Sequence, residues 1–182
     1  NAAENHPISF RWVMKAKERG ATLIHVDPRF TRTSAKADIY VPLRSGTDIA
    51  FLGGMINYIL EKKKYNEEYI ILYTNASFLV KPEFKLTADN RGVFSGYDPK
   101  ARQYDKSTWS FQKDEKGLVK KDPELKDPNC VFQLLRKHYS RYLPELVEQI
   151  TGTPREELLK VYEIYASTGQ SGKSGTVMYA MG

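Results

Sequence analysis

The chain has 182 residues, of which 41% are hydrophobic and 12% aromatic, so it is large enough to fold around a core as one domain. The formal net charge is +6, but many lysines stand in mixed runs such as Lys113–Lys116, which are typical of a solvated surface and argue against a nucleic-acid partner. No apolar run approaches the ~20 residues of a membrane helix. A single cysteine, Cys130, excludes an internal disulfide and is expected to be a small buried side chain.

The first elements predicted are a helix, a strand and a second strand. A helix over residues 7–19 carries Ile8, Trp12 and Ala16 at helical spacing and ends at Gly20. A short apolar strand follows over residues 22–26 and stops at Asp27–Pro28, because proline cannot donate to a continuing ladder. A second strand near residues 40–43 leads into the loop 44–48 and then a helix.

The two strand ends together outline a nucleotide pocket. Asp27 stands at the carboxyl end of a strand, where an acidic side chain can accept hydrogen bonds from ribose or a purine base. Arginines 29, 32 and 44 and hydroxyls such as Thr31 surround the two ends and suit a pyrophosphate. Gly46 lets backbone approach a phosphate, and Thr47 or Asp48 can cap the following helix. Each feature taken alone is ordinary turn or cap chemistry, whereas their combination favours a pocket.

The rest of the chain predicts helices around one long insertion. A helix is expected over residues 66–73. Residues 76–129 are polar, tyrosine-rich and interrupted by glycine and proline, so they form either an excursion that covers a partner surface or a segment partly disordered in isolation; short strands near Phe94 and residues 109–111 would favour the excursion. Helices at 131–140 and 144–150 follow, and a third begins with Thr153 as its cap. Residues 175–180 read as a final buried strand. No histidine, cysteine and acid pattern has metal-ligand spacing, so no metal site built by side chains is expected.

Several of these segments resemble, in order, the large (alpha) subunit of respiratory formate dehydrogenases, which are molybdopterin-guanine-dinucleotide oxidoreductases. The resemblance rests on Asn1–Pro7, Val26–Thr33, Arg44–Asp48, Thr74–Ser77, Gly96–Asp98, Tyr104–Ser107, Ser140–Tyr142, Thr151–Pro154 and Tyr179–Gly182. It implies an α/β, Rossmann-like dinucleotide-binding domain over residues 1–182, with a mainly parallel sheet flanked by helices and a long irregular insertion at about 76–129. It also implies that the chain is an internal fragment of that subunit.

The resemblance further implies that the chain holds one molybdopterin guanine dinucleotide of a bis-MGD cofactor carrying molybdenum or tungsten, in an enzyme that oxidises formate to carbon dioxide. Guanosine recognition falls to Asp27 and Asp48. The full cofactor-binding set implied is Asn1, Glu4, Asn5, His6, Val26, Asp27, Pro28, Arg29, Thr31, Gly46, Thr47, Asp48 and Gly182. No residue of this chain is expected to be catalytic or to bind the metal.

What the chain lacks also follows from the resemblance. The iron–sulfur cluster and the selenocysteine or cysteine on the metal are expected outside this fragment, which alone should be inactive. Expected partners are the rest of the alpha subunit, an iron–sulfur subunit and a membrane cytochrome subunit. The intact enzyme is expected to be periplasmic or membrane-associated, with any export signal upstream of Asn1. The alternatives are a non-catalytic nucleotide-binding or subunit-interaction module, and a fragment that binds nothing once isolated.

Overall fold

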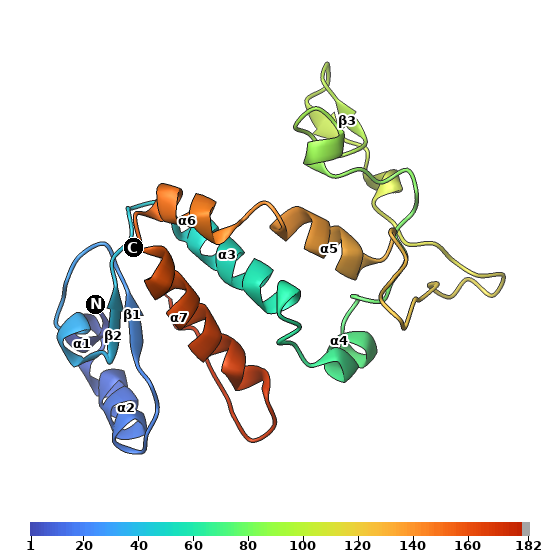
Figure 1. The fold of residues 1–182 in the computed structure, drawn as a ribbon. Coiled ribbons are helices and arrows are strands. Elements are labelled where there is room, and N and C mark those ends of the chain that lie inside the picture. The colour runs from blue at the N-terminus through green and yellow to red at the C-terminus, as the bar shows by residue number, and fades with distance from the viewer. Residues whose placement is uncertain (180–182) are drawn as a thin grey trace. The chain divides into compact units, whose positions relative to one another are not determined.

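The computed structural model describes residues 1–179 and divides the chain into two compact units. The first unit comprises Asn1–Lys64 and the chain from Tyr142 onward, and the second comprises Tyr65–Arg141. The first unit contains the parallel strands and most of the helices (Figure 1). The insertion predicted at about 76–129 lies inside the second unit.

A pair of parallel strands forms the sheet of the first unit. β1 (Ile24–Val26) pairs with β2 (Ile39–Val41) in the register Ile24↔Ile39 to Val26↔Val41. Both strands therefore end at one edge, where Asp27 follows β1 and Pro42 follows β2. The 3₁₀ turn η1 (Ser34–Lys36) lies in the crossover between them. The predicted α/β class, with parallel strands flanked by helices, is confirmed.

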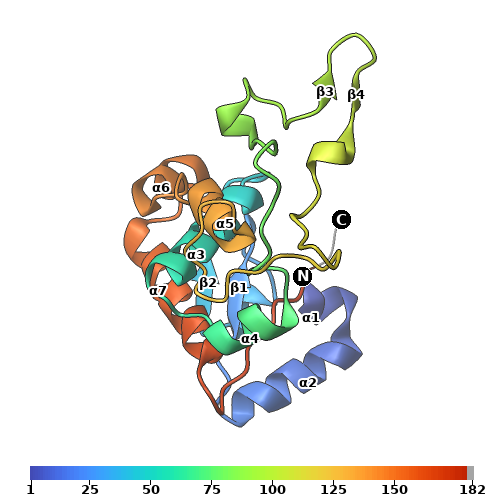
Figure 2. The ribbon, with the colours of Figure 1, turned by 90° about the vertical axis from the view of Figure 1, so that its right-hand side faces the viewer.

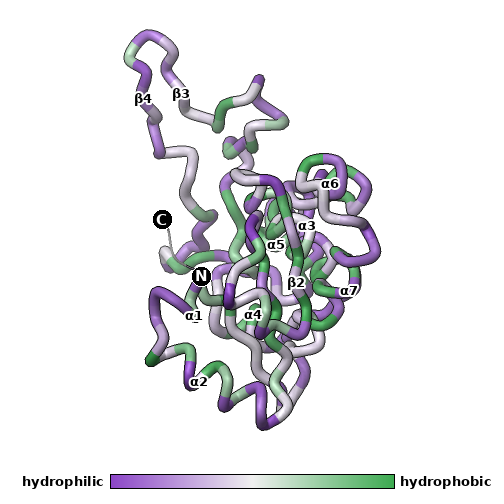
Figure 3. Tube along the Cα trace, turned by 90° about the vertical axis from the view of Figure 1, so that its left-hand side faces the viewer, coloured by the Kyte–Doolittle hydropathy of each residue, from purple (hydrophilic) through white to green (hydrophobic). Residues whose placement is uncertain are grey.

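The N-terminal helices are α1 (Ala2–Asn5) and α2 (Pro7–Glu18). Gly20 terminates α2 as predicted, two residues after Glu18, and its φ of 94° allows the amides of Gly20 and Ala21 to bond the carbonyls of Lys17 and Ala16. Phe10 is the buried residue of α2, whereas Ile8 is 76% and Trp12 68% exposed. Hydropathy along α2 alternates between polar and apolar segments (Figure 3).

The core of the first unit lies between three of its helices and the strands. α3 (Asp48–Glu61) packs against α6 (Pro144–Thr151) and α7 (Arg155–Ala166), as Figure 2 shows. Tyr162 of α7 is fully buried, and its hydroxyl donates to the carbonyl of Phe51 at 2.8 Å. The buried members of this core are Val41, Leu43, Phe51, Met55, Val147, Leu158, Val161 and Tyr162.

Two predictions for the C-terminal part of this unit are wrong. Thr153 does not cap α7, because its hydroxyl donates instead to the carbonyl of Pro42 at 2.7 Å; the amide of Arg155 bonds the carboxylate of Glu148 at 3.0 Å. After the 3₁₀ turn η4 (Ser167–Gly169), residues 175–179 form no strand and are exposed, so the predicted buried strand is absent over the part of it that the structure describes. Residue 180 lies outside the described range.

The second unit is mostly irregular, with two helices. Its elements are α4 (Glu67–Tyr73), η2 (Thr87–Asp89), β3 (Tyr97–Asp98), β4 (Gln103–Tyr104), η3 (Lys106–Thr108) and α5 (Val131–Tyr139). β3 and β4 form an antiparallel hairpin, visible in Figure 2. Phe94 is in no strand and packs its ring on those of Phe84 and Trp109, and residues 109–111 contribute only the single bridge Val80↔Phe111.

Cys130 belongs to the core of this second unit, as predicted. It is fully buried, and its Sγ lies 2.8 Å from the carbonyl oxygen of Ala76. Burial raises the pKa of the Cys130 thiol above its usual value, which makes the thiolate scarce near neutral pH. Cys130 is therefore a structural side chain.

Candidate nucleotide-binding site

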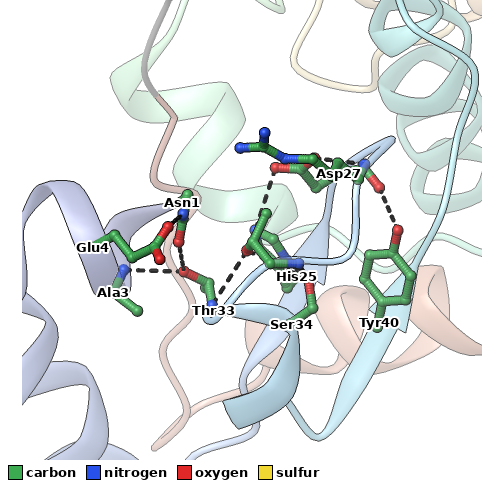
Figure 4. A network of polar contacts seen from close by, with 10 residues as sticks. Asn1, Ala3, Glu4, His25, Asp27, Thr33, Ser34 and Tyr40 are labelled. Atoms are coloured by element: carbon green, nitrogen blue, oxygen red, sulfur yellow. Dashed lines mark hydrogen bonds and ion pairs between the residues drawn. The ribbon is translucent and has the colours of Figure 1, made fainter.

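Asp27 is fixed at the carboxyl end of β1 by contacts from three directions (Figure 4). Its Oδ1 accepts the amide of Arg29 at 2.8 Å, which forms the tight turn around Pro28. Its carbonyl oxygen accepts the hydroxyl of Tyr40, on β2, at 3.0 Å. Its Oδ2 lies 3.7 Å from Nε2 of His25. Oδ2 thus retains capacity to accept hydrogen bonds from a ligand.

The turn that follows Asp27 is built on buried hydroxyls. Ser34 Oγ accepts the amide of Thr31 at 2.8 Å, and Thr31 Oγ1 accepts the amide of Thr33 at 3.2 Å. All three side chains are buried. The Thr31 side chain, predicted to contact the cofactor, therefore lies inside the turn and shapes it.

The N-terminal segment is attached to the same turn (Figure 4). Thr33 Oγ1 accepts the amide of Ala3 at 3.0 Å and donates to Oδ1 of Asn1 at 3.3 Å. Asn1 in turn donates to the carboxylate of Glu4, which pairs with Nε of Arg32 at 3.0 Å. The structure thereby brings Asn1 and Glu4 to the turn after β1, whereas Asn5 and His6 are exposed, and among residues 1–179 no hydrogen bond or ion pair joins their side chains to that turn.

The loop after β2 presents backbone and not side chains. Gly46 has a φ of 79°, and a Cβ built there would meet nothing within 4 Å. Thr47 occupies the N-cap position of α3, but its hydroxyl donates back to the carbonyl of Arg44 at 2.6 Å, so the predicted side-chain cap is not formed. Within the described chain, the amides of Asp48 and Ile49 have no acceptor. Such amides at the start of a 14-residue helix favour an anion.

The three arginines predicted to face a pyrophosphate have different partners. Arg44 Nη1 donates to the carbonyls of Gln149 and Ile150 at 2.5 and 3.1 Å, so its guanidinium binds the C-terminal end of α6. Arg32 pairs with Glu4. Arg29 alone has an exposed guanidinium without a partner in the described range.

Of the remaining predicted residues, Val26 is the last residue of β1 and packs against the core, and Pro28 is exposed in the turn. Asp48 is exposed at the start of α3. Gly182 lies outside the described residues.

No hydrogen bond joins the turn 27–34 to the loop 46–48 among residues 1–179. In the same range, no group of histidine, cysteine and carboxylate side chains is placed to hold a metal ion, and no helix is long and apolar enough to cross a bilayer.

Sequence reasoning places Ser34 among the neutral donors of the pocket but misses two residues that hold this site, His25 and Tyr40. The imidazole of His25 lies between Ser34 and Asp27, and burial lowers its pKa, while Asp27 acts in the opposite direction. The contact between His25 and Asp27 could have been predicted from the alternation of side chains along a strand, because residues 25 and 27 project to the same face of β1.

Known proteins similar to this chain were found by sequence and by structure. It is 59% identical over its whole length to the formate dehydrogenase subunit alpha of Megalodesulfovibrio gigas and 55% identical to the nitrate-inducible formate dehydrogenase major subunit of Escherichia coli. It spans about 18% of the length of each. In structure, 91% of the chain aligns with 15% of acetylene hydratase from Pelobacter acetylenicus, with a TM-score of 0.53 and 23% identity, which shows a shared fold. No protein-family model matches the chain.

Proposed function

We propose that this chain, which is homologous from end to end to a segment of the formate dehydrogenase alpha subunits, binds the guanosine end of a molybdopterin guanine dinucleotide where β1 and β2 end. The observation that carries the proposal is the Asp27 carboxylate, held at the carboxyl end of a parallel strand with Oδ2 still able to accept hydrogen bonds. A guanine base offers two adjacent N–H groups, which a carboxylate can accept together.

The loop after β2 fits the phosphate side of such a ligand. Gly46 leaves room for close approach, and the amides of Asp48 and Ile49 lack acceptors within the described chain. Arg29 adds a guanidinium able to hold phosphate oxygens in pairs. The Asp48 carboxylate is favourable at the start of α3 and would repel phosphate, so we assign it to guanosine recognition.

The N-terminal residues complete the assignment. Asn1 and Glu4, joined to the turn through Thr33, would line the ribose or pyrophosphate side together with Asn5 and His6. Thr31, Val26 and Pro28 shape the turn, Thr47 anchors the loop, and Gly182 is proposed at the edge of the pocket.

In the intact enzyme we infer that a metal–dithiolene centre would supply the two-electron redox chemistry by which formate becomes carbon dioxide and a proton. This chain would bind and orient the cofactor and would be inactive alone. The iron–sulfur cluster, the selenocysteine or cysteine on molybdenum or tungsten, and the second dinucleotide-binding domain would belong to the rest of the alpha subunit. Iron–sulfur and membrane cytochrome subunits, and a periplasmic location, belong to the same proposal for the whole enzyme.

A second candidate function, subunit interaction, is favoured by one feature of the second unit. α4 exposes Tyr69, Leu72 and Tyr73, and the two tyrosine rings lie 5.5 Å apart. Exposed aromatic side chains gathered on one helix are typical of protein–protein interfaces. The nucleotide site belongs to the first unit and this helix to the second.

The test compares guanosine, inosine and adenosine diphosphates in calorimetric titrations of the chain. Inosine lacks the 2-amino group, from which the Asp27 carboxylate would accept a hydrogen bond. We therefore expect inosine diphosphate to bind about three- to tenfold more weakly than guanosine diphosphate, the effect of one hydrogen bond. Adenosine diphosphate should bind more weakly still, because it offers a carboxylate no such pair of N–H groups. Equal affinity for the three ligands would favour a phosphate site without guanine recognition, and no binding by folded protein would contradict the proposal.

A further inference from the structure

His25 connects the buried hydroxyls of the turn to the carboxylate of Asp27 (Figure 4). It is the middle residue of β1 and is half-buried. Its Nδ1 lies 2.9 Å from Ser34 Oγ, and its Nε2 lies 3.7 Å from Asp27 Oδ2. The two ring nitrogens thus face partners of opposite kinds, a hydroxyl and a carboxylate.

The hydrogen-bond partners determine which nitrogen carries the proton. Ser34 Oγ accepts the amide of Thr31, which leaves one hydroxyl proton to donate. His25 Nδ1 at 2.9 Å is a nearer acceptor than Thr31 Oγ1 at 3.5 Å. We therefore assign Nδ1 as the acceptor in neutral His25 and place the proton on Nε2, facing Asp27 Oδ2.

We propose that His25 is a positioning residue for guanine recognition, which holds the Asp27 carboxylate in the orientation that the base requires. The Arg29 amide fixes Oδ1, and the Nε2–H of His25 attracts Oδ2, so the plane of the carboxylate is set before ligand binds. This inference rests on the proposed function. It adds that orientation of the carboxylate, and not only its presence, determines affinity.

The same arrangement makes binding depend on pH. The titratable groups that face His25 are the Asp27 carboxylate and Tyr40 of β2, whose stacked ring lies 6.2 Å away; its other partner, Ser34, is a neutral hydroxyl. Burial lowers the pKa of His25 from its ordinary 6.5, and the Asp27 carboxylate acts in the opposite direction. When protonated, His25 draws Asp27 into an ion pair and competes with the base. We therefore expect guanine affinity to fall as pH drops through the pKa of His25.

The test is a calorimetric titration with guanosine diphosphate of the wild type, His25→Asn and His25→Gln. Asparagine can reach Ser34 but not Asp27, so the carboxylate loses the N–H that faces it, and we expect a roughly three- to tenfold loss of affinity, the size of one polar interaction. Glutamine keeps an N–H donor for Asp27 and should stay within about twofold of wild type, by the same reasoning. His138→Asn, in the second unit, is the matched control and should bind as wild type does.

The pH arm uses the ratio of wild-type to His25→Gln affinities, in which titration of the ligand phosphate cancels. This affinity ratio should decrease as the pH is lowered below 6.5, whereas a purely structural His25 would leave the ratio independent of pH. Because His25→Asn could lose the fold, ¹H–¹⁵N correlation spectra of wild-type imidazoles provide a second test. A proton on Nδ1 at neutral pH, or His25→Asn binding as tightly as wild type, would overturn the positioning role. Wild type that shows the expected tautomer but does not bind the ligand overturns the proposed function, and the role falls with it.

Discussion

At the scale of single residues, the partner of an arginine decides whether it stabilises the fold or is available to a ligand, as Arg29, Arg32 and Arg44 illustrate. All three follow strand ends and suit a phosphate from the sequence alone. Arg44 is engaged by two carbonyls at the end of α6, and Arg32 by Glu4, so only Arg29 keeps its guanidinium for a ligand. The sequence could not assign them, because Gln149 and Ile150 are more than a hundred residues from Arg44 in the chain.

We expect alanine at Arg44 to affect stability and alanine at Arg29 to affect nucleotide binding. Arg44→Ala should lower the free energy of unfolding by about 1 kcal/mol, because two carbonyls at a helix C-terminus lose a charged donor, and should leave nucleotide affinity unchanged. Arg29→Ala should leave stability unchanged and weaken binding of guanosine diphosphate. Urea unfolding and calorimetry measure both quantities on each variant. The reverse pattern would place Arg44, and not Arg29, at the ligand.

At the scale of elements, helical spacing predicted where the helices lie more accurately than which side of them is buried. α2, α3 and α4–α6 begin or end within about two residues of the predicted positions. Yet Ile8 and Trp12, taken as the apolar face of α2, are exposed, and Phe10 is buried. Spacing shows that a helix has an apolar stripe but not what covers it. The failed Thr153 cap has a similar cause, since the Pro42 carbonyl is a partner that local sequence does not reveal.

Two aromatic residues of α2 provide a direct test of its buried side. Phe10→Ala should lower the free energy of unfolding by about 3 kcal/mol, because it empties a buried site. Trp12→Ala, in the same helix, should change it by no more than about 0.5 kcal/mol despite the larger side chain. Urea denaturation of the two variants gives the comparison. A greater loss from Trp12→Ala would mean that the exposed side of α2 is the packed one.

Gly54 permits the close approach of α3 to α6 and α7. A Cβ there would lie 2.6 Å from the Tyr162 hydroxyl and 2.9 Å from Val147 Cγ2. Gly54→Ala should therefore destabilise the protein by about 1–3 kcal/mol, although alanine is the better helix former. Tyr162→Phe removes the nearest atom, so the double variant should lose less stability than the sum of the two single variants. Additive losses would show that the tyrosine oxygen is not the source of the clash.

At the scale of the whole molecule, the chain contains two units with separate cores. The first carries the parallel strands and the candidate site, and its helices and strand ends were largely predictable from periodicity and turn residues. In the second, the β3–β4 hairpin and the aromatic contacts of Trp109 were not predicted, because they depend on pairings across polar, glycine-rich sequence without periodicity.

Cys130, the single cysteine, reports on the second unit alone. Its buried thiol should react slowly with a thiol reagent, through transient opening of that unit. Phe132→Leu loosens the packing beside Cys130 and should speed labelling about tenfold for each 1.4 kcal/mol lost. Gly54→Ala, in the first unit, should change the labelling rate far less. Equal acceleration by both variants would show that the two units open together.

The central claim is that the Asp27 carboxylate, at the edge where two parallel strands end, holds a guanine nucleotide. The most direct measurement is calorimetric titration of guanosine diphosphate into wild type, Asp27→Ala and Asp98→Ala, whose Asp98 forms a similar turn with the amide of Lys100 in the second unit. The account predicts saturable binding by wild type and Asp98→Ala and its loss in a folded Asp27→Ala. Undiminished binding by Asp27→Ala, or none by folded wild type, would contradict it.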